Sequence, residues 1–189
     1  MNLNDQLFRA EHIFLGPIDH EKDAEIEAGW WRNVEYLRML NTDLVYPVSA
    51  SQLKKRYGTI EKDQDEKNNL FYFTIRLKED SKLIGFAKLF WIEWLHGTGF
   101  VQMGIGESQY QNLGYGREAL HLLLRFAFGE INLFRLTAVI PEYNLAALGL
   151  FKQMGFVEEV RRRQAVHRDG QRWDSIHLGI LSREWYTRL

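Results

Sequence analysis

Two glycines two positions apart, Gly114 and Gly116, stand in the segment Gln111-Asn112-Leu113-Gly114-Tyr115-Gly116, directly before an expected helix. The start of a helix carries unpaired backbone N–H groups and about half a unit of positive charge. Glycines let a ligand approach such groups closely because they have no side chain. The segment is therefore a candidate cradle for a pyrophosphate. For an isolated Gly-x-Gly, the simpler alternative is a tight strand-to-helix turn.

Two other glycine motifs are disfavoured. Gly104-Ile105-Gly106 begins like a dinucleotide-binding fingerprint, but its third glycine is replaced by Gln109. The segment 106–110 resembles the nucleophile elbow of serine hydrolases, but it ends in Tyr110 and does not open directly into a helix. Neither a Rossmann domain nor a serine hydrolase is expected.

The elements that must position the glycine segment follow from hydrophobic periodicity. Phe71, Phe73, Ile75 and Leu77 alternate with polar residues, which is typical of a half-buried strand, and Asp169-Gly170 indicates a hairpin turn. The expected elements are a strand over 13–17, a helix over 19–30, a short helix over 52–57 capped by Ser49, a polar loop or fraying helix end over 61–69, strands over 71–78, 83–94 and 100–105, a helix over 117–128 ended by Gly129, a strand over 135–140, a helix over 144–154 ended by Gly155, and strands over 157–167 and 172–181. This order predicts an α/β protein built around one sheet.

Composition narrows the class of protein further. The 189 residues predict one domain over 1–189, and 46% hydrophobic residues provide for a buried core. The absence of cysteine removes disulfides and thiolate chemistry, and the six histidines lack metal-ligand spacing, so no metal is expected. A net charge of −1 disfavours nucleic-acid partners, and without an apolar run at residues 1–10 or a membrane span we expect a cytoplasmic protein.

Several segments together are typical of one family. Gln111 to Gly116 matches the pattern Q/R-x-x-G-x-G/A, and it is accompanied by Ile105-Gly106, Tyr110, Glu118-Ala119, the segment 144–156 and the hairpin 168–170. Over nearly its whole length the chain thus resembles the GNAT superfamily of acetyl-CoA-dependent N-acetyltransferases, and most closely the RimJ/RimL-like subgroup. The resemblance implies a GNAT-like fold with a mostly antiparallel sheet of about six or seven strands.

The resemblance also implies an activity. The protein would transfer an acetyl group from acetyl-CoA, its cosubstrate, to a primary amine by direct attack in a ternary complex. The acceptor would be a small-molecule or peptide amine, such as a protein N-terminus or a polyamine, and a homodimer is left open. Two alternatives remain: a non-catalytic acyl-CoA sensor or interaction module, and a nucleotide-binding α/β domain.

The resemblance assigns cofactor contacts to particular residues. The backbone of Gly104, Ile105 and Gly106 would pair with the pantetheine arm where two strands splay apart. Asn144 would meet the arm near the sulfur, or simply cap a helix. The glycine segment begins at Gln111. The pyrophosphate would bind the backbone N–H groups of the residues that follow, namely Asn112, Leu113, Gly114, Tyr115, Gly116 and Arg117.

The chain departs from the family at its acid and base. Phe151 stands where many members have a tyrosine as general acid, on the helix that follows the asparagine. Val139 stands where some members have a glutamate base, on the fifth strand. A thiol pKa of about 8.5 makes unassisted thiolate departure tolerable. Other groups that could face an acceptor are Glu93, His96, Glu107, Glu142 and Tyr143, although a lone carboxylate or histidine near a loop is more often simply solvated. We select Glu107 as the candidate base, because it directly follows the strand that would hold the thioester.

Two further groups have ordinary explanations. Trp30-Trp31, Trp91 and Trp94 could line an acceptor pocket, but aromatic residues at these spacings more often belong to a core. Arg161-Arg162-Arg163 lies on an expected strand, whose alternation puts neighbouring side chains on opposite faces. We therefore expect a solvated strand face rather than one basic patch.

Overall fold

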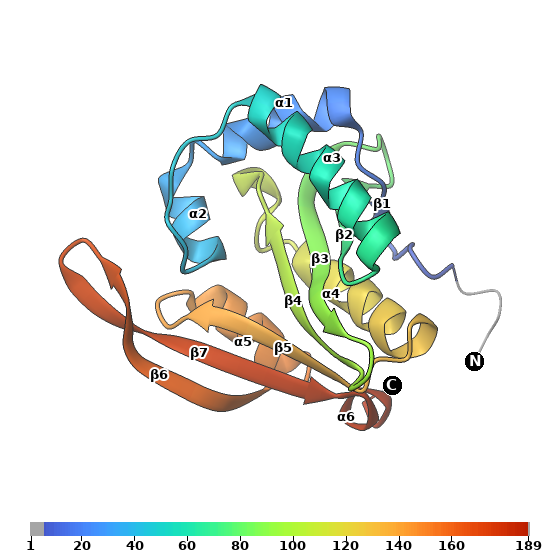
Figure 1. Cartoon of the computed structure of the whole chain (residues 1–189), viewed down its shortest axis with the longest axis vertical. Helices are drawn as coiled ribbons and strands as arrows, with labels where there is room; N and C mark the ends of the chain where they lie inside the picture. The colour runs from blue at the N-terminus through green and yellow to red at the C-terminus, as the bar shows by residue number, and fades with distance from the viewer. Residues whose placement is uncertain (1–5, 189) are drawn as a thin grey trace.

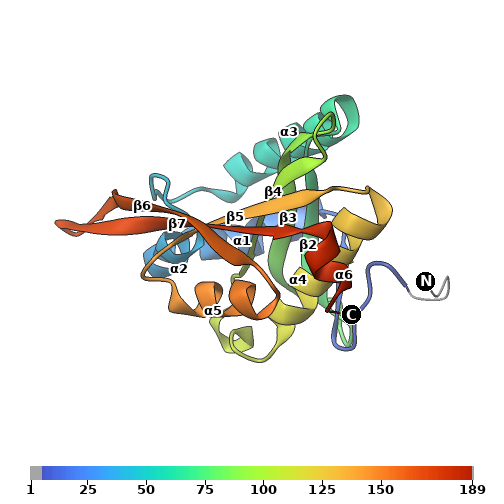
Figure 2. The same ribbon diagram turned by 90° about the horizontal axis from the view of Figure 1, so that it is seen from below.

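The computed structural model describes residues 6–188, which form a seven-stranded sheet with helices on both faces (Figures 1 and 2). The strands are β1 (Ile13–Gly16), β2 (Phe71–Leu77), β3 (Leu83–Glu93), β4 (Thr98–Ile105), β5 (Arg135–Pro141), β6 (Val157–Arg168) and β7 (Gln171–Leu181). The helices are α1 (His20–Trp30), α2 (Val34–Leu40), α3 (Ala50–Lys67), α4 (Tyr115–Arg125), α5 (Leu145–Gln153) and α6 (Ser182–Tyr186), with a 3-10 turn at Ser108–Tyr110 and a π-helical turn at Phe126–Glu130. Residues 1–5, which are half of the N-terminal segment without an apolar run, lie outside the described part.

The sheet has the order β1-β2-β3-β4-β5-β7-β6, and all neighbouring strands are antiparallel except β4 and β5. The predicted α/β class and mostly antiparallel sheet are confirmed. Asp169 and Gly170 both have positive φ angles, 50° and 74°, at the tip of the β6–β7 hairpin, which extends from the body of the molecule (Figure 1). The hairpin prediction is therefore also confirmed.

The strand register puts two sets of side chains on opposite faces of the sheet. Phe73, Ala87 and Met103 pair across β2, β3 and β4 and belong to the core beneath α4. Tyr72, Lys88 and Gln102 form the adjacent cross-strand row and therefore point to the opposite face. That face is covered by α1, α2 and α3, so polar groups of three strands lie beneath these helices.

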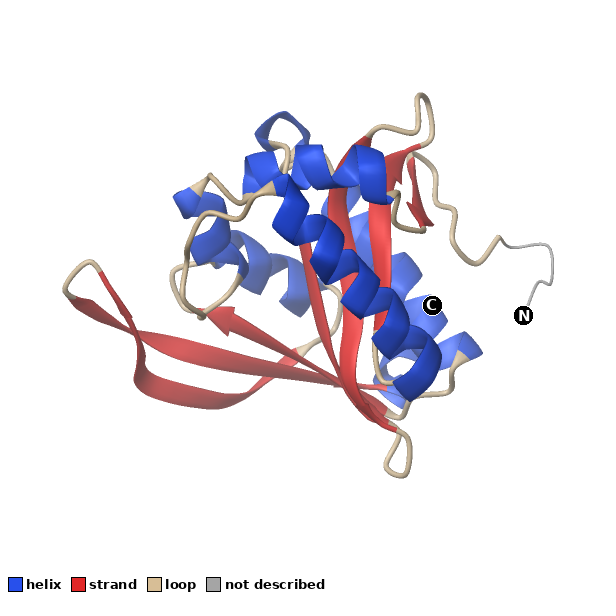
Figure 3. Cartoon of the chain, turned by 45° about the horizontal axis from the view of Figure 1, so that its top comes forward, coloured by secondary structure: helices blue, strands red, loops and turns tan. Residues whose placement is uncertain are grey.

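Strands β4 and β5 pair at one end only. Their parallel ladder joins Thr98, Gly99 and Phe100 to residues 135–137, and beyond Phe100 the strands diverge (Figure 3). The segment 101–105 of β4 consequently offers backbone groups on this side without a strand partner. This opening is the splay expected at the cofactor strand.

Several predicted boundaries are wrong. The polar segment 61–69 is mostly helical, because α3 continues to Lys67 with exposed pairs such as Asp63 with Lys67 at 2.8 Å. Helix α4 begins at Tyr115, two residues early, and Gly129 lies inside the π-helical turn rather than ending the helix. The short helices α2 and α6 are not predicted, since seven and five residues are too few for a clear periodicity.

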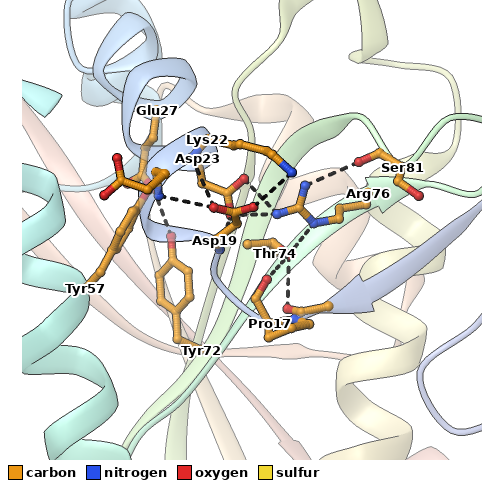
Figure 4. Close-up of polar contacts among 12 residues, drawn as sticks. Pro17, Asp19, Lys22, Asp23, Glu27, Tyr57, Tyr72, Thr74, Arg76 and Ser81 are labelled. Atoms are coloured by element: carbon orange, nitrogen blue, oxygen red, sulfur yellow. Dashed lines mark hydrogen bonds and ion pairs between the residues drawn. The ribbon is translucent and has the colours of Figure 1, made fainter.

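A buried ion pair attaches α1 to the sheet (Figure 4). The Asp23 carboxylate, 1% exposed, accepts hydrogen bonds from Arg76 Nη2 at 2.6 and 2.7 Å and from the Asp19 N–H at 2.7 Å. Arg76 Nε also donates to Thr74 Oγ1 at 3.1 Å, and the Thr74 hydroxyl donates to the Gly16 carbonyl at 3.0 Å. One network thus fixes β1, α1 and β2 relative to one another.

No helix within residues 6–188 has the length and apolar character to cross a bilayer.

Candidate active site

A cleft of about 1010 Å³ opens where β4 and β5 diverge, bounded by α2, the start of α4 and α5. Most of the sequence-predicted cofactor residues line it, namely Gly104, Ile105, Gln111, Asn112, Gly114, Gly116, Arg117, Asn144 and Phe151. Four predicted residues do not line it, namely Gly106, Glu107, Leu113 and Tyr115. The sequence therefore locates the cleft, with exceptions at the end of β4 and in the loop.

The start of α4 presents free backbone donors to this cleft. Gly114 has φ of 92°, which favours glycine, and it caps the helix without a side-chain hydrogen bond. Within residues 6–188, the N–H groups from Asn112 to Gly116 have no hydrogen-bond partner, whereas the Arg117 N–H donates to the Gly114 carbonyl at 2.9 Å. Five of the six predicted donors are thus available, and Arg117 can contribute only its side chain. Such an array binds anions.

The end of β4 is held closely by two other elements. A Cβ atom at Gly104 would lie 2.6 Å from the Tyr36 hydroxyl oxygen, so only glycine allows this approach. The side chain of Gln111 donates to the Ile105 carbonyl at 2.8 Å and ties the loop to the strand. The Gly106 N–H donates to the Ile84 carbonyl at 2.9 Å, and the Trp30 ring covers this glycine. Gly106 is therefore bonded to β3 and covered by Trp30, whereas Gly104 lines the cleft.

Three side chains fasten the end of α2 over the cleft. The Tyr143 hydroxyl donates to the Arg38 carbonyl at 2.8 Å, Asn144 Nδ2 to the Met39 carbonyl at 2.8 Å, and Gln102 Nε2 to the Leu40 carbonyl at 3.2 Å. Asn144 Oδ1 also accepts the Ala147 N–H at 3.0 Å, which is the predicted helix cap. The capping role is thus present, and one Asn144 amide hydrogen is left for a ligand.

The candidate acids and bases are placed unevenly. Glu107 lies outside the cleft, and its Oε1 accepts from Trp30 Nε1 at 3.0 Å. Glu142 accepts the Asp174 N–H at 2.7 Å, while Glu93 accepts from Thr98 at the β3–β4 turn. Of the five candidate groups Glu93, His96, Glu107, Glu142 and Tyr143, only Tyr143 lines the cleft. Phe151 and Val139, which replace the family's acid and base, also line the cleft.

A second pocket of about 260 Å³ lies on the opposite face of the sheet, beneath α1 and α3. It shares Tyr36, Leu40 and Gln102 with the cleft, so the two spaces meet at these residues. Sequence reasoning missed its polar groups Glu27, Tyr36 and Lys88, and only the Trp30-Trp31 pair signalled it. Trp91 and Trp94 are 67% and 47% exposed and line neither space, so the core explanation is wrong for them.

Tyr36 has the one aromatic hydroxyl at the junction of the two spaces. It is buried and without a hydrogen-bond partner within residues 6–188, and burial raises its pKa well above the usual range. A hydroxyl in this state stays protonated and can donate one hydrogen bond to a ligand.

Nearby, burial also raises the pKa of Glu27, although hydrogen bonds from Tyr57, Trp31 and Tyr72 oppose that shift (Figure 4).

No group of three or more His, Asp or Glu side chains in the described part of the chain could hold a metal ion. The arrangement instead combines an anion cradle, an open strand edge and an adjoining polar pocket. These features suit a long, amide-rich, phosphorylated ligand and a second, smaller molecule.

Comparison with known proteins places the fold and site in one family. The family model described as acetyltransferase (GNAT) domain matches residues 12–157, so the chain belongs to the GNAT acetyltransferases. It is 29% identical over 127 residues to the uncharacterized N-acetyltransferase YnaD of Bacillus subtilis (strain 168), covering 65% of this chain and 71% of that one.

Two further likenesses extend over almost the whole chain. The probable N-acetyltransferase YjcK of Bacillus subtilis (strain 168) is 26% identical over 182 residues, covering 93% of this chain and 97% of its own. The crystal structure of spermidine N-acetyltransferase from Vibrio cholerae in complex with CoA and spermine superposes with a TM-score of 0.81 at 21% identity, covering 92% and 98%. The chain is accordingly an acetyl-CoA-dependent N-acetyltransferase with the GNAT fold.

Proposed function

We propose that the protein, acting as one domain in the cytoplasm, acetylates a small primary amine by direct attack in a ternary complex. The amine nitrogen forms a C–N bond to the thioester carbonyl carbon, and the C–S bond breaks. The nitrogen loses a proton and the CoA thiolate gains one, so charge and atoms balance. The observation that carries the proposal is the row of N–H groups from Asn112 to Gly116, which have no partner in the described part of the chain and lie beside the open edge of β4.

In this proposal the cofactor follows the cleft. The pyrophosphate binds the N–H groups from Asn112 to Gly116, with the Arg117 side chain adding charge. The pantetheine arm pairs with the backbone of Gly104 and Ile105, and the remaining amide hydrogen of Asn144 meets the arm. Acetyl-CoA fits this donor set, because it offers phosphate oxygens to the helix start and amides to the strand.

The acceptor is the finer part of the proposal. The Vibrio cholerae structure is of a spermidine N-acetyltransferase, which supports a small amine as acceptor here. The motif set from Gly114 to the 168–170 hairpin supports membership of the RimJ/RimL-like subgroup.

Thiol release separates this enzyme from the alternative of an acyl-CoA sensor, which Phe151 and Val139 at the cleft favour. Adding a panel of primary amines to protein and acetyl-CoA should release free CoA thiol well above the rate without protein. A sensor would bind acetyl-CoA and release none above background.

Replacing Tyr36 with phenylalanine should slow acetyl transfer by about 100-fold, the usual cost of losing one donor to a developing oxyanion. The hydroxyl adjoins Gly104 and has no hydrogen-bond partner within residues 6–188, so it is placed to donate to the thioester oxygen. Steady-state kinetics would measure kcat, and the acetyl-CoA Kd should change little. Tyr110→Phe, outside both spaces, is the control, and equal rates for the two variants would remove Tyr36 from the mechanism.

The Glu107→Gln variant tests the candidate base. If Glu107 accepts the amine proton through water, the acidic limb of the pH–rate profile should change and the maximal rate should fall about 100-fold. The alternative is a structural role, because Glu107 Oε1 accepts a hydrogen bond from Trp30 Nε1 at 3.0 Å. An unchanged pH–rate profile would show that Glu107 only holds the Trp30 indole in place.

A further inference from the structure

The second pocket contains two opposite charges that are not paired with each other. The Glu27 side chain belongs to α1 and that of Lys88 to β3, and both line the pocket. Within residues 6–188 neither forms an ion pair within 4.0 Å, although Arg76 and Asp23 nearby do. Each charge therefore lacks a close counter-ion inside a partly dry space.

Glu27 is organised as a site for a cation. It is 9% exposed, and its carboxylate accepts from Tyr57 at 2.6 Å, Trp31 Nε1 at 3.2 Å and Tyr72 at 3.3 Å. Three neutral donors orient the carboxylate (Figure 4 shows the Tyr57 and Tyr72 side) but do not neutralise it. A buried carboxylate without a counter-ion is costly, so an ammonium ion in the pocket would stabilise it. The aromatic rings around it also suit a cation.

Lys88 is the complementary anchor. Its Nζ lies 4.7 Å from the centre of the Phe90 ring, and burial lowers its pKa. The other charged residues at the pocket are Arg56 and Asp43. The Arg56 guanidinium is engaged, because it donates to the Tyr46 hydroxyl at 2.7 Å and stacks on Trp31 at 4.7 Å. Asp43 is exposed at the rim. Lys88 is therefore the cation available to an anionic group.

We propose that this pocket binds the acceptor, and that the acceptor is a small amine that also carries an anionic group, held by its amino group at Glu27 and by its anion at Lys88. The amine arrives as an ammonium and passes one proton to the Glu27 carboxylate, which frees the nitrogen lone pair for attack. The inference rests on the proposed function. A volume of about 260 Å³ holds a molecule of amino-acid size, and the shared residues Tyr36, Leu40 and Gln102 join it to the cleft. A polycation would place positive charge beside Lys88 and Arg56, so spermidine is a poor acceptor in this account.

The test compares matched acceptors. Glycine, β-alanine, 4-aminobutyrate and 5-aminopentanoate are each paired with the alkylamine of the same chain length, and spermidine is added. Thiol release gives kcat/KM for each. For at least one length the carboxylated amine should be preferred by about 10-fold or more, the size expected for one charge-assisted contact. Lys88→Met should reduce that preference to within about 2-fold, and Lys88→Arg should keep most of it.

The outcomes separate this inference from the proposed function. Equal or faster reaction of alkylamines or spermidine at every length would overturn the inference and leave the proposed function standing. No thiol release with any amine, or failure of acetyl-CoA itself to raise the melting temperature, would contradict the proposed function instead. Should Lys88→Met melt early, Lys88→Gln replaces it, and quenching of tryptophan fluorescence by the carboxylated amines measures binding without turnover.

Discussion

Replacing Gly116 with glutamate is expected to weaken acetyl-CoA binding by at least about 100-fold, because a carboxylate would compete with the pyrophosphate for the N–H groups at the start of α4. The fold should tolerate the change. A Cβ atom at Gly116 meets only Leu150 at 3.5 Å and Met103 at 3.7 Å, which is ordinary contact. A negative charge in the first turn of a helix is favourable by about 0.3–1 kcal/mol. The variant should therefore melt no earlier than the unmodified protein.

Gly58→Glu is the matched control for this loss of binding. Gly58 lies in α3, has open space around it and lines neither pocket. The substitution therefore adds the same negative charge away from the cleft. Isothermal titration with acetyl-CoA would compare the three proteins. Equal affinity for both glutamate variants would show that the pyrophosphate does not bind at the start of α4.

Removing the Asp23 side chain as Asp23→Ala should destabilise the protein by about 3–5 kcal/mol, the usual cost of leaving one partner of a buried ion pair uncompensated. Arg76 would keep its charge at 15% exposure with no carboxylate beside it. Helix α1 would lose its attachment to β2 (Figure 4). This helix carries Glu27 and Trp30, which line the second pocket. Urea denaturation followed by circular dichroism measures the loss.

An exposed ion pair provides the comparison for Asp23→Ala. Asp63 pairs with Lys67 four residues later on α3, where both side chains are about a third or more exposed. Asp63→Asn should cost no more than about 0.5 kcal/mol. If the two variants lose similar free energy of unfolding, the network around Arg76 does not hold α1 in place.

The parts of the fold with strong local signals could be predicted from the sequence. The alternation in Phe71 to Leu77 and the Asp169-Gly170 turn depend on neighbouring residues only, and both are present. Helix α2 could not be predicted, because its seven residues are too few to show a periodic pattern of apolar residues. Its buried residues, Tyr36 and Leu37, are covered by contacts with distant parts of the chain. The full length of α3 could not be predicted either. Its C-terminal half is polar and has the composition of a loop, but exposed charge pairs four residues apart stabilise it as a helix.

The same division applies to the candidate site. The glycine segment is contiguous in sequence, so its place at the start of α4 follows from the motif. Glu27, Tyr36 and Lys88 come from three separate elements and meet only in the folded chain. Gly106 and Glu107 adjoin the cofactor strand, but Trp30, far away in sequence, covers one and hydrogen-bonds the other. Proximity along the chain therefore does not by itself bring these two residues into the cleft.

The melting temperature of the purified protein with saturating acetyl-CoA tests the central claim most directly, with ATP and NAD as controls. At about 100 times its Kd, a ligand that binds only the folded protein adds about 2.7 kcal/mol of stability. We predict a clear upward shift with acetyl-CoA and none with ATP or NAD. A folded protein whose melting temperature acetyl-CoA leaves unchanged would contradict binding of this cosubstrate in the cleft between β4 and β5.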